Sequence, residues 1–433
     1  MQANRKAIEL AWAFETDPAH DTDHDGIYDN SQGTGWVENW PVAMPHQEIY
    51  LALLDQQASA AMAKIEKQLG NQEASAAAER RAAQVAATIE FEYYDKEKGC
   101  YAFSHNTDGS QDRTTNVYPA LAWWDPDGKP VLAHGDECLR QLAEHTLNTD
   151  WGLRDISNEE KIYDGTSYHY GSVWPLFTGW AALAEYRGGQ PLAGYQMLME
   201  NANLTWAQDL GADTEWLSGD FYTPMPSSTS HQLWSSAMVI TPTLRGLFGI
   251  SIDAQTKTIT VNPHLAAGWD HAEVKNLRVG DATVDLLFTQ TKIAILAQNT
   301  ILAWIKPTDS GVSLRHDGSE VRGDRGISIA LHPVEVAPLS SAPLPGDRTQ
   351  SLRILNEDYG ERRLTLTCEG LSGTEARLPL VLTAANLKLR AAGAELQSAT
   401  GEKNPASPGD GAVVVVRFPP GEGWKTITVT LTW

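Results

Sequence analysis

The chain is 433 residues long and carries 55 acidic residues against 33 Lys and Arg, which gives a formal net charge of −22. This length allows two or more domains, and a hydrophobic content of 42% excludes a disordered chain. The charge argues against nucleic acid or an anionic membrane as a partner and is compatible with a neutral substrate.

The first residues, MQANRKAIELAWAFETD, predict an amphipathic helix over residues 4–15. They lack the apolar core of a signal peptide, and no apolar run of the chain is long enough to span a bilayer. The sequence therefore does not identify a compartment.

An acidic loop, DTDHDGIYDNSQ, follows this helix. Asp21, Asp23, Asp25 and Asp29 match positions one, three, five and nine of a calcium loop, with a glycine at the sharp turn. Position twelve is Gln32 rather than a bidentate glutamate, which argues against a calcium sensor. A structural calcium bound by the four aspartates and a metal-free loop held by Asx turns both stay open, and we favour the metal-free loop.

Helices dominate the chain up to residue 249. Ala, Leu, Glu and Gln, which favour helices, are frequent in the two longest candidates, and Gly188-Gly189 separates two later ones. Pro45 suits a helix first turn. The predicted helices cover residues 4–15, 45–69, 73–93, 116–124, 133–148, 172–187, 191–208 and 232–248.

After residue 250 the pattern changes to a period of two, as in TKTITVNPHL, ATVDLLFTQ and KTITVTLTW. We predict an all-β sandwich region over residues 250–433, which the Pro/Ser-rich stretch 336–350 would divide. The predicted fold is therefore an α+β multidomain protein, with a helical domain at 1–249 and a β-sandwich region after it.

The cysteines and tryptophans give weaker indications. Cys100, Cys138 and Cys368 are odd in number and far apart, so we expect buried thiols rather than a disulfide framework or a zinc site. Fifteen tryptophans suit a carbohydrate-binding protein, because indoles pack on sugar rings, but they also suit an aromatic core.

Cleavage of a glycosidic bond usually needs two carboxyl groups, and acids within aromatic, Gly-rich loops are the candidates for them. The first such stretch is GTGWVENWP, in which Glu38 stands between Trp36 and Trp40. A carboxyl group among indoles would have its pKa raised by desolvation, as a general acid requires.

Two further stretches share this character. YDGTSYHYGSVWP contains Asp164, Tyr168, His169 and Trp174, and DTEWLSGDFYTPMPSSTSHQLWSSA contains Glu215, Asp220, His231, Gln232 and Trp234, with Ser230 as a possible helix cap. Each stretch also has a purely structural interpretation: an exposed loop acid, a hydrogen-bonded corner of the core, or an acid in a salt bridge. Three aromatic, acidic loops in one helical domain favour the functional interpretation.

These motifs resemble the six-hairpin (α/α)6-toroid glycoside hydrolases, and among them most the glycogen-debranching (amylo-α-1,6-glucosidase-like) and glucoamylase-like enzymes. The resemblance rests on D-x-D-x-D-G followed by G-W-x-E-x-W, on Y-H-x-G-S-V-W-P, and on T-E-W-L-S-G followed by H-Q-L-W-S. It spans roughly residues 10–290. Tyr170 stands where many members carry Gln or Asn, and Trp216 and the missing proline before Glu215 also depart from the pattern.

The resemblance implies an inverting glycosidase that acts on an α-glucan or oligosaccharide and needs no cofactor. Glu38 would be the general acid and Glu215 the general base, with their carboxyl groups about 6.5–9.5 Å apart. The implied substrate-binding residues are Trp36, Trp40, Arg154, Asp164, Tyr168, His169, Trp174, His231, Gln232 and Trp234.

A complete toroid of this family has twelve helices, whereas about eight are predicted here. The acid-bearing loop also begins unusually early, so we expect an N-terminally incomplete toroid with uncovered apolar helix faces. Three explanations fit an incomplete toroid: a fragment, a natural truncation, or a chain whose toroid is completed by another segment or by an oligomer. An incomplete toroid would impair activity. The alternative function is non-catalytic carbohydrate binding.

Overall fold

The computed structural model describes residues 2–30, 35–41, 44–125, 131–208, 210–293, 298–340, 342–384, 387–398 and 412–433. Gln32, on which the argument against a calcium sensor rested, lies outside these residues. No helix among the described residues is both long and apolar enough to cross a membrane.

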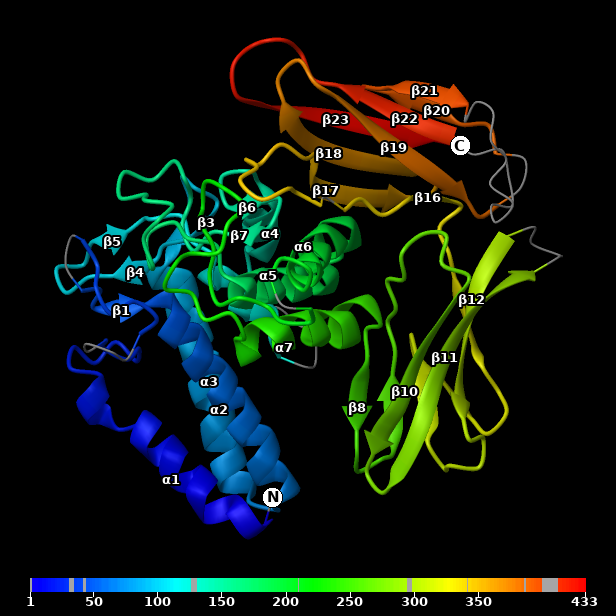
Figure 1. Ribbon diagram of the computed structural model, residues 1–433. Coiled ribbons are helices and arrows are strands. Elements are labelled where there is room, and N and C mark those ends of the chain that lie inside the picture. Colours follow the sequence, from blue (N-terminus) through cyan, green and yellow to red (C-terminus); the bar gives the residue numbers. More distant parts are fainter. Residues whose placement is uncertain are drawn as a thin grey trace.

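The helical part precedes the sheets, and its described residues contain seven α-helices (Figure 1). These are α1 (Arg5–Glu15), α2 (Ile49–Gln68), α3 (Gln72–Glu92), α4 (Gly135–Ala143), α5 (Pro175–Arg187), α6 (Pro191–Leu204) and α7 (Leu233–Pro242). Short helical turns lie at η1 (Gln2–Asn4), η2 (Pro18–His20), η3 (Tyr118–Trp123) and η4 (Thr243–Leu247). The helix predicted at 116–124 is therefore the 3₁₀ turn η3.

Two predicted helix-start signals, Pro45 in a first turn and Ser230 as a cap, were wrong. α2 begins at Ile49, after Pro45, because Gln47 and Glu48 form the short strand β1 (Gln47–Glu48), which pairs with β4 (Ser104–His105). α7 begins at Leu233, and its cap is Gln232, whose side chain accepts a 3.0 Å hydrogen bond from the backbone N–H of Leu233. The pairing of β1 with β4 delays the start of α2, and the side chain of Gln232 caps α7 in place of Ser230.

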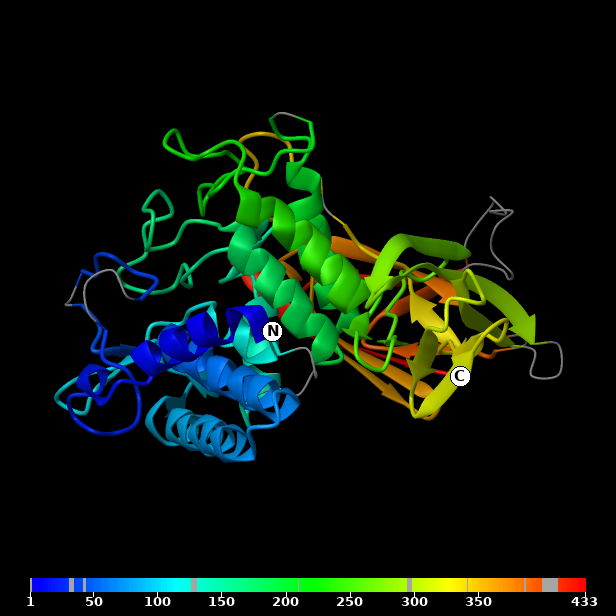
Figure 2. The ribbon, with the colours of Figure 1, turned by 90° about the horizontal axis from the view of Figure 1, so that it is seen from below.

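Helix pairs form the core of this part. α2 and α3 are antiparallel neighbours, and α1 lies beside them, as Figure 2 shows from below. α5 is buried from Pro175 to Tyr186 and packs against α6 and α7. Gly179 makes the α5–α7 contact possible, because a Cβ atom there would lie 2.3 Å from the Cβ of Met238. The predicted break is present: α5 ends at Arg187, and Gly189 has a φ of +79°.

Small sheets join the helices. Their strands are β1 with β4 and β5 (Gln111–Asp112), β2 (Tyr94–Asp95) with β3 (Cys100–Tyr101), and β6 (Asn148–Thr149) with β7 (Gly152–Leu153). A disulfide links Cys100 in β3 to Cys138 in α4, and only Cys368 is a free, buried thiol. The expectation of three free thiols was therefore wrong: the fold brings the two Cα atoms within 5.2 Å across 38 residues of sequence.

The β part starts at Ser251 and consists of four-stranded sheets in two groups. One group has β14 (Ser319–Arg322), β13 (Ser313–His316), β9 (Thr258–Thr260) and β8 (Ser251–Asp253) in one sheet, and β10 (His271–Val279), β11 (Ala282–Ile293), β12 (Gln298–Lys306) and β15 (Ile327–Ala330) in the other. The second group has β16 (Val334–Val336), β19 (Glu375–Leu382), β22 (Ala412–Arg417) and β21 (Glu395–Ser398), and then β17 (Arg353–Gly360), β18 (Arg363–Leu371), β23 (Trp424–Thr432) and β20 (Arg390–Ala392).

Each group of sheets has its own buried cluster. Alternate residues point inward, for example Leu364, Leu366 and Cys368 of β18, as the period of two requires. Arg353 at the start of β17 is buried and pairs with Asp150 and Glu200 of the helical part. The second group of sheets is thus tied to the helices by a buried ion-pair network.

Candidate active site

The three stretches selected from the sequence lie together. We name them loop A (residues 35–41), loop B (163–175) and loop C (213–231). The Nε2 atom of His169 in loop B lies 3.1 Å from Oε2 of Glu38 in loop A. Tyr168, the preceding residue, donates a 2.8 Å hydrogen bond from its Oη to Oε1 of Glu215 in loop C. Two consecutive residues of loop B therefore contact both predicted carboxylates.

Aromatic contacts join the same loops. The Trp36 ring lies 5.2 Å from that of Trp174, which immediately precedes α5, and 6.2 Å from that of Trp234 in α7. Trp234 and Tyr168 are each 37% exposed, so both remain accessible to a ligand.

Loop B owes its shape to its own side chains. Asp164 accepts hydrogen bonds from the backbone N–H and the hydroxyl of Thr166, which lower the pKa of its carboxyl group. The buried Trp174 donates from Nε1 to the hydroxyl of Ser172 and to the carbonyl of Tyr168. Gly171 has a φ of +142° and lies against Tyr163, so another residue would be strained there. Asp164, which is exposed, and Trp174, which is buried, both shape the loop, and their substrate-binding roles stay predictions.

Loop C is held on several sides. The backbone groups of Leu217 and Val173 exchange two 2.9 Å hydrogen bonds, which fixes loop C against loop B. Arg154 is 4% exposed and donates from Nε to the carbonyl of Gly219, and from Nη1 to two carbonyls before β6. Its predicted role in substrate binding is therefore corrected, because its guanidinium group is used inside the protein.

Glu215 is buried at the base of loop C, with 9% of its surface exposed. Its backbone N–H donates to the carbonyl of Thr229, whose own N–H lies 3.4 Å from Oε2 of the carboxylate. Burial, and secondly the hydrogen bond to Glu215, raise the pKa of Tyr168. Tyr168 is therefore a neutral donor at any physiological pH.

Glu38 differs from the prediction. Its side chain is 71% exposed, so the enclosure between two indoles on which its acid character was argued is absent. Trp40 is 5% exposed, stacks on Phe103 at 4.4 Å and donates from Nε1 to Asp112, so it belongs to the core and not to the rim of a pocket. The sequence pattern could not show to which side each indole turns.

His169 is the buried partner of this exposed acid. Burial lowers the pKa of His169, and the adjacent Glu38 opposes that shift only in part. Its imidazole is therefore neutral near pH 7. Its Nδ1 atom is buried and has no hydrogen-bond partner among the described residues.

His231 and Gln232 lie before α7. The Nδ1 atom of His231 is 2.9 Å from the hydroxyl of Ser230, and His231 is exposed. Gln232 caps α7 with its side-chain oxygen, so that oxygen is already engaged in a hydrogen bond, and the predicted ligand contact stays a prediction.

Two residues behind loop A were missed by the sequence argument. Glu48 is fully buried and accepts a 3.0 Å hydrogen bond from the backbone N–H of Trp36, two residues before Glu38. Burial raises the pKa of Glu48 to about 7, against the opposing effect of the N–H groups of Trp36 and Val37. The stretch PHQEIY has the pattern of a helix start, and nothing in it indicates a carboxylate that turns back onto loop A.

The neighbouring Gln47 holds the acidic loop. Its Nε2 atom lies within 3.1–3.4 Å of carboxylate oxygens of Asp23, Asp25 and Asp29. Asp21 accepts from the N–H groups of Asp25 and Gly26, at 3.1 Å each. These hydrogen bonds hold the acidic loop in shape, and its predicted metal-free state stays a prediction.

The same side chains form two groups that could hold a cation. They are Asp21, Asp23 and Asp25, and separately Asp23, Asp29 and His46, whose ligand atoms lie within 4.8 Å of one another in each group. Carboxylate oxygens are ligands that Ca²⁺ prefers. Both groups include aspartates of the acidic loop, which is the calcium site that the sequence left open.

Two cavities lie away from the three loops. One of about 700 Å³ runs along α2, and one of about 480 Å³ lies where the helices meet both groups of sheets. Glu38 and Glu215 line neither of them.

No known protein family matches the chain, and no curated sequence is a detectable relative. A solved structure named Sialidase is similar over 74% of this chain, with a TM-score of 0.59 and 11% identity. The chain spans 31% of that structure, so the similarity concerns the fold of a part of it.

Weaker similarities are to neutral trehalase Nth1 from Saccharomyces cerevisiae and to the GH63 mannosylglycerate hydrolase from Thermus thermophilus. The TM-scores are 0.36 and 0.38, the identities 12% and 16%, and the shares of this chain 46% and 45%. These matches cover 38% and 45% of those two chains. Scores this low support no argument about this chain.

Proposed function

We propose that the chain is a glycoside hydrolase, or the part of one that carries its two carboxylates, and that its helices are part of an (α/α) toroid. The observation that carries the proposal is the pair of contacts made by Tyr168 and His169 to Glu215 and Glu38. Glu38 and Glu215 come from distant segments and both contact loop B. Glycoside hydrolysis usually requires such a pair of carboxyl groups.

In the proposed reaction, Glu38 donates its proton to the glycosidic oxygen while the bond from that oxygen to the anomeric carbon breaks. Glu215 takes a proton from a water molecule, whose oxygen forms the new bond to the anomeric carbon from the opposite face. The product is inverted at that carbon. Buried Glu215, with hydrogen bonds from Tyr168 and Thr229, suits a fixed base, whereas exposed Glu38 is placed to meet a large leaving group.

The proposed substrate is a neutral α-linked glucan or oligosaccharide. Exposed Trp234 and Tyr168 offer ring faces for a sugar, and exposed His231 offers a hydrogen bond. A net charge of −22 disfavours an acidic glycan.

Non-catalytic carbohydrate binding is the second candidate, and one observation favours it. Glu38 is 71% exposed and lacks the apolar enclosure that usually keeps a general acid protonated. A protein that binds sugars on the aromatic rim would not need that enclosure.

Incubation with a panel of neutral α- and β-linked oligosaccharides separates the two candidates. The hydrolase proposal predicts cleavage of an α-linked member by the wild type and loss of cleavage, with binding kept, in Glu38→Gln. Binding of glycans without cleavage by the wild type would favour the second candidate.

A further inference from the structure

The cavity along α2 is a groove with a regular apolar floor. The floor consists of Leu51, Leu54, Ala58, Ala61 and Ile65, which we name the α2 stripe. These residues follow one another at spacings of three and four, so they lie on one face of the helix, over about 21 Å. Within the described part of the chain, no helix covers this face: its members are half-buried or exposed.

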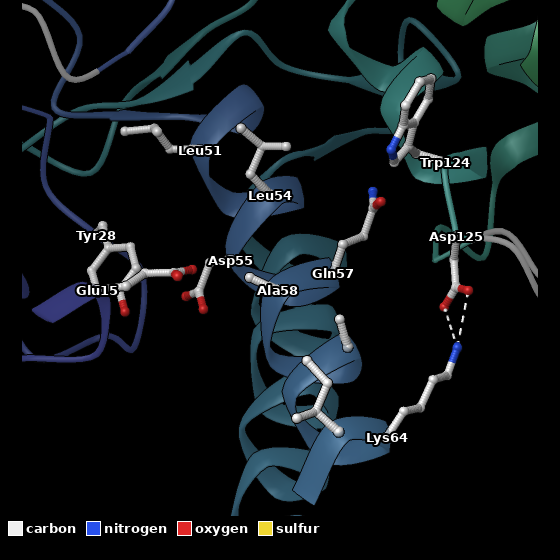
Figure 3. Close-up of a pocket in the computed structure, with 12 residues that line it drawn as sticks. Glu15, Tyr28, Leu51, Leu54, Asp55, Gln57, Ala58, Lys64, Trp124 and Asp125 are labelled. Atoms are coloured by element: carbon white, nitrogen blue, oxygen red, sulfur yellow. Dashed lines mark hydrogen bonds and ion pairs between the residues drawn. The ribbon is translucent and has the colours of Figure 1, made fainter. Parts of the chain in front are cut away.

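The walls of the groove come from other segments, as Figure 3 shows. Glu15 and Tyr28 lie at one side of α2 near Asp55, and Trp124 lies at the other side. The ion pair between Lys64 and Asp125 closes that second side, with 3.1 Å between Nζ and Oδ1. α1 does not fill the groove, since Ile8 and Trp12 pack instead against Met62 and Ala78.

This floor fits a helix better than a small ligand. A stripe at spacings of three and four is the surface into which the side chains of a second helix pack. Ala58 and Ala61 stand in its middle, and their small side chains let another backbone approach closely. A sugar would find few hydrogen-bonding groups along this aliphatic face.

Glu15 and Tyr28 form the polar end of the groove, and the acid among them favours an occupant with a positive charge. Glu15 is half-buried and forms no ion pair within the described residues. Burial, and secondly Asp55, raise its pKa to about 7. The Tyr28 ring beside it lies under the guanidinium of Arg81, 4.9 Å from the ring centroid, and the buried Tyr28 hydroxyl makes no hydrogen bond of normal geometry among the described residues. Asp55 needs no further partner, because Arg81 binds both of its oxygens.

We propose that this groove binds a basic amphipathic α-helix from another polypeptide segment. Its apolar side chains pack on the α2 stripe, and one Lys or Arg donates to Glu15 and Tyr28. A second copy of this chain is disfavoured as the occupant, because two chains of charge −22 repel each other, whereas a basic helix is attracted.

The direct test is fluorescence anisotropy of a labelled synthetic helix of about 18 residues, a length at which an isolated helix becomes marginally stable. It carries leucines at spacings of three and four and one lysine at the end that meets Glu15. A second peptide has glutamine in place of that lysine, and a third has the leucines scrambled. The protein is the full chain.

The proposal predicts that the lysine peptide binds and that the scrambled peptide does not. Ala61→Arg, an exposed change on the stripe, should weaken binding about tenfold or more, because it places a charge on the apolar contact. Glu15→Gln should weaken the lysine peptide about threefold or more and leave the glutamine peptide unchanged. Glu79→Gln, at an exposed acid of α3, is the matched control.

Circular dichroism melts of each variant establish that it is folded. Equal binding of the scrambled peptide, equal effects of Glu15→Gln and Glu79→Gln, or no binding by the folded wild type would overturn the proposal. None of these outcomes depends on glycosidase activity.

Discussion

The hydroxyl of Tyr168 lies 2.8 Å from Oε1 of Glu215 and donates a hydrogen bond to it. The next residue, His169, contacts Glu38, so neighbouring side chains hold two acids that are 177 positions apart in the sequence. Their mutual placement therefore depends on one turn of backbone, fixed by Gly171 and by the buried Trp174.

Tyr168→Phe removes that hydrogen bond with little change of volume. We expect kcat/KM to fall about tenfold, as for one lost hydrogen bond to a charged group, with a smaller effect on the melting temperature. Steady-state kinetics on the cleaved oligosaccharide measure the loss. Tyr195→Phe in α6, outside the three loops, is the control, and an equal loss there would contradict the role of Tyr168.

Glu48 should position loop A without touching substrate. Glu48→Ala removes the acceptor of the Trp36 N–H, so we expect kcat to fall about tenfold while KM changes little. Glu48→Gln keeps an acceptor and should restore most of the activity. Because the pKa of Glu48 is raised to about 7, any step near pH 7 in the wild-type profile should be absent in Glu48→Gln. Failure of the conservative variant to rescue would contradict positioning.

The grouping of the three loops into one site was predicted from the order of their motifs, which resembles that of a known family, and not from any local property of the sequence. The sequence also predicted the change from helices to strands near residue 250, since hydrophobic periods of 3.6 and 2 are local properties. The direction of Trp40, the carboxylate of Glu48 and the bond between Cys100 and Cys138 depend on contacts between distant segments. The spacing of residues along the sequence does not indicate which distant segments come into contact.

Glu357 makes stability depend on pH at the junction of the helices and the second group of sheets. Burial raises its pKa to about 8, although the N–H of Leu192 donates to its carboxyl group. The raised pKa means that its contribution to stability is full below about pH 4.5 and is lost as pH rises toward 8.

We therefore expect Glu357→Gln to flatten the pH dependence of the unfolding free energy by about 1.4 kcal/mol per pH unit between pH 5 and 8. Urea denaturation at several pH values measures this slope. Glu361→Gln in the neighbouring exposed turn is the control. An unchanged slope in Glu357→Gln would show that the carboxyl group ionises equally in folded and unfolded chains.

The acidic loop should not need calcium. Its carboxylates already accept N–H groups, including that of Ile27 at 2.7 Å from Asp25, and the amide of Gln47. We expect the melting temperature to be the same in EDTA and in millimolar Ca²⁺. Gln47→Glu would replace the amide by another carboxylate, and this variant should gain a Ca²⁺-dependent melting temperature. A Ca²⁺-dependent rise in the wild type would contradict the metal-free loop.

Glu38 and Glu215 are proposed to act on opposite faces of the sugar. Time-resolved proton NMR of an α-linked oligosaccharide during cleavage tests this proposal most directly, because the anomeric signals identify the first product. We expect the β-anomer to form first, and neither Glu38→Gln nor Glu215→Gln to produce it at the wild-type rate. First appearance of the α-anomer, or cleavage unchanged in either variant, would contradict the proposal.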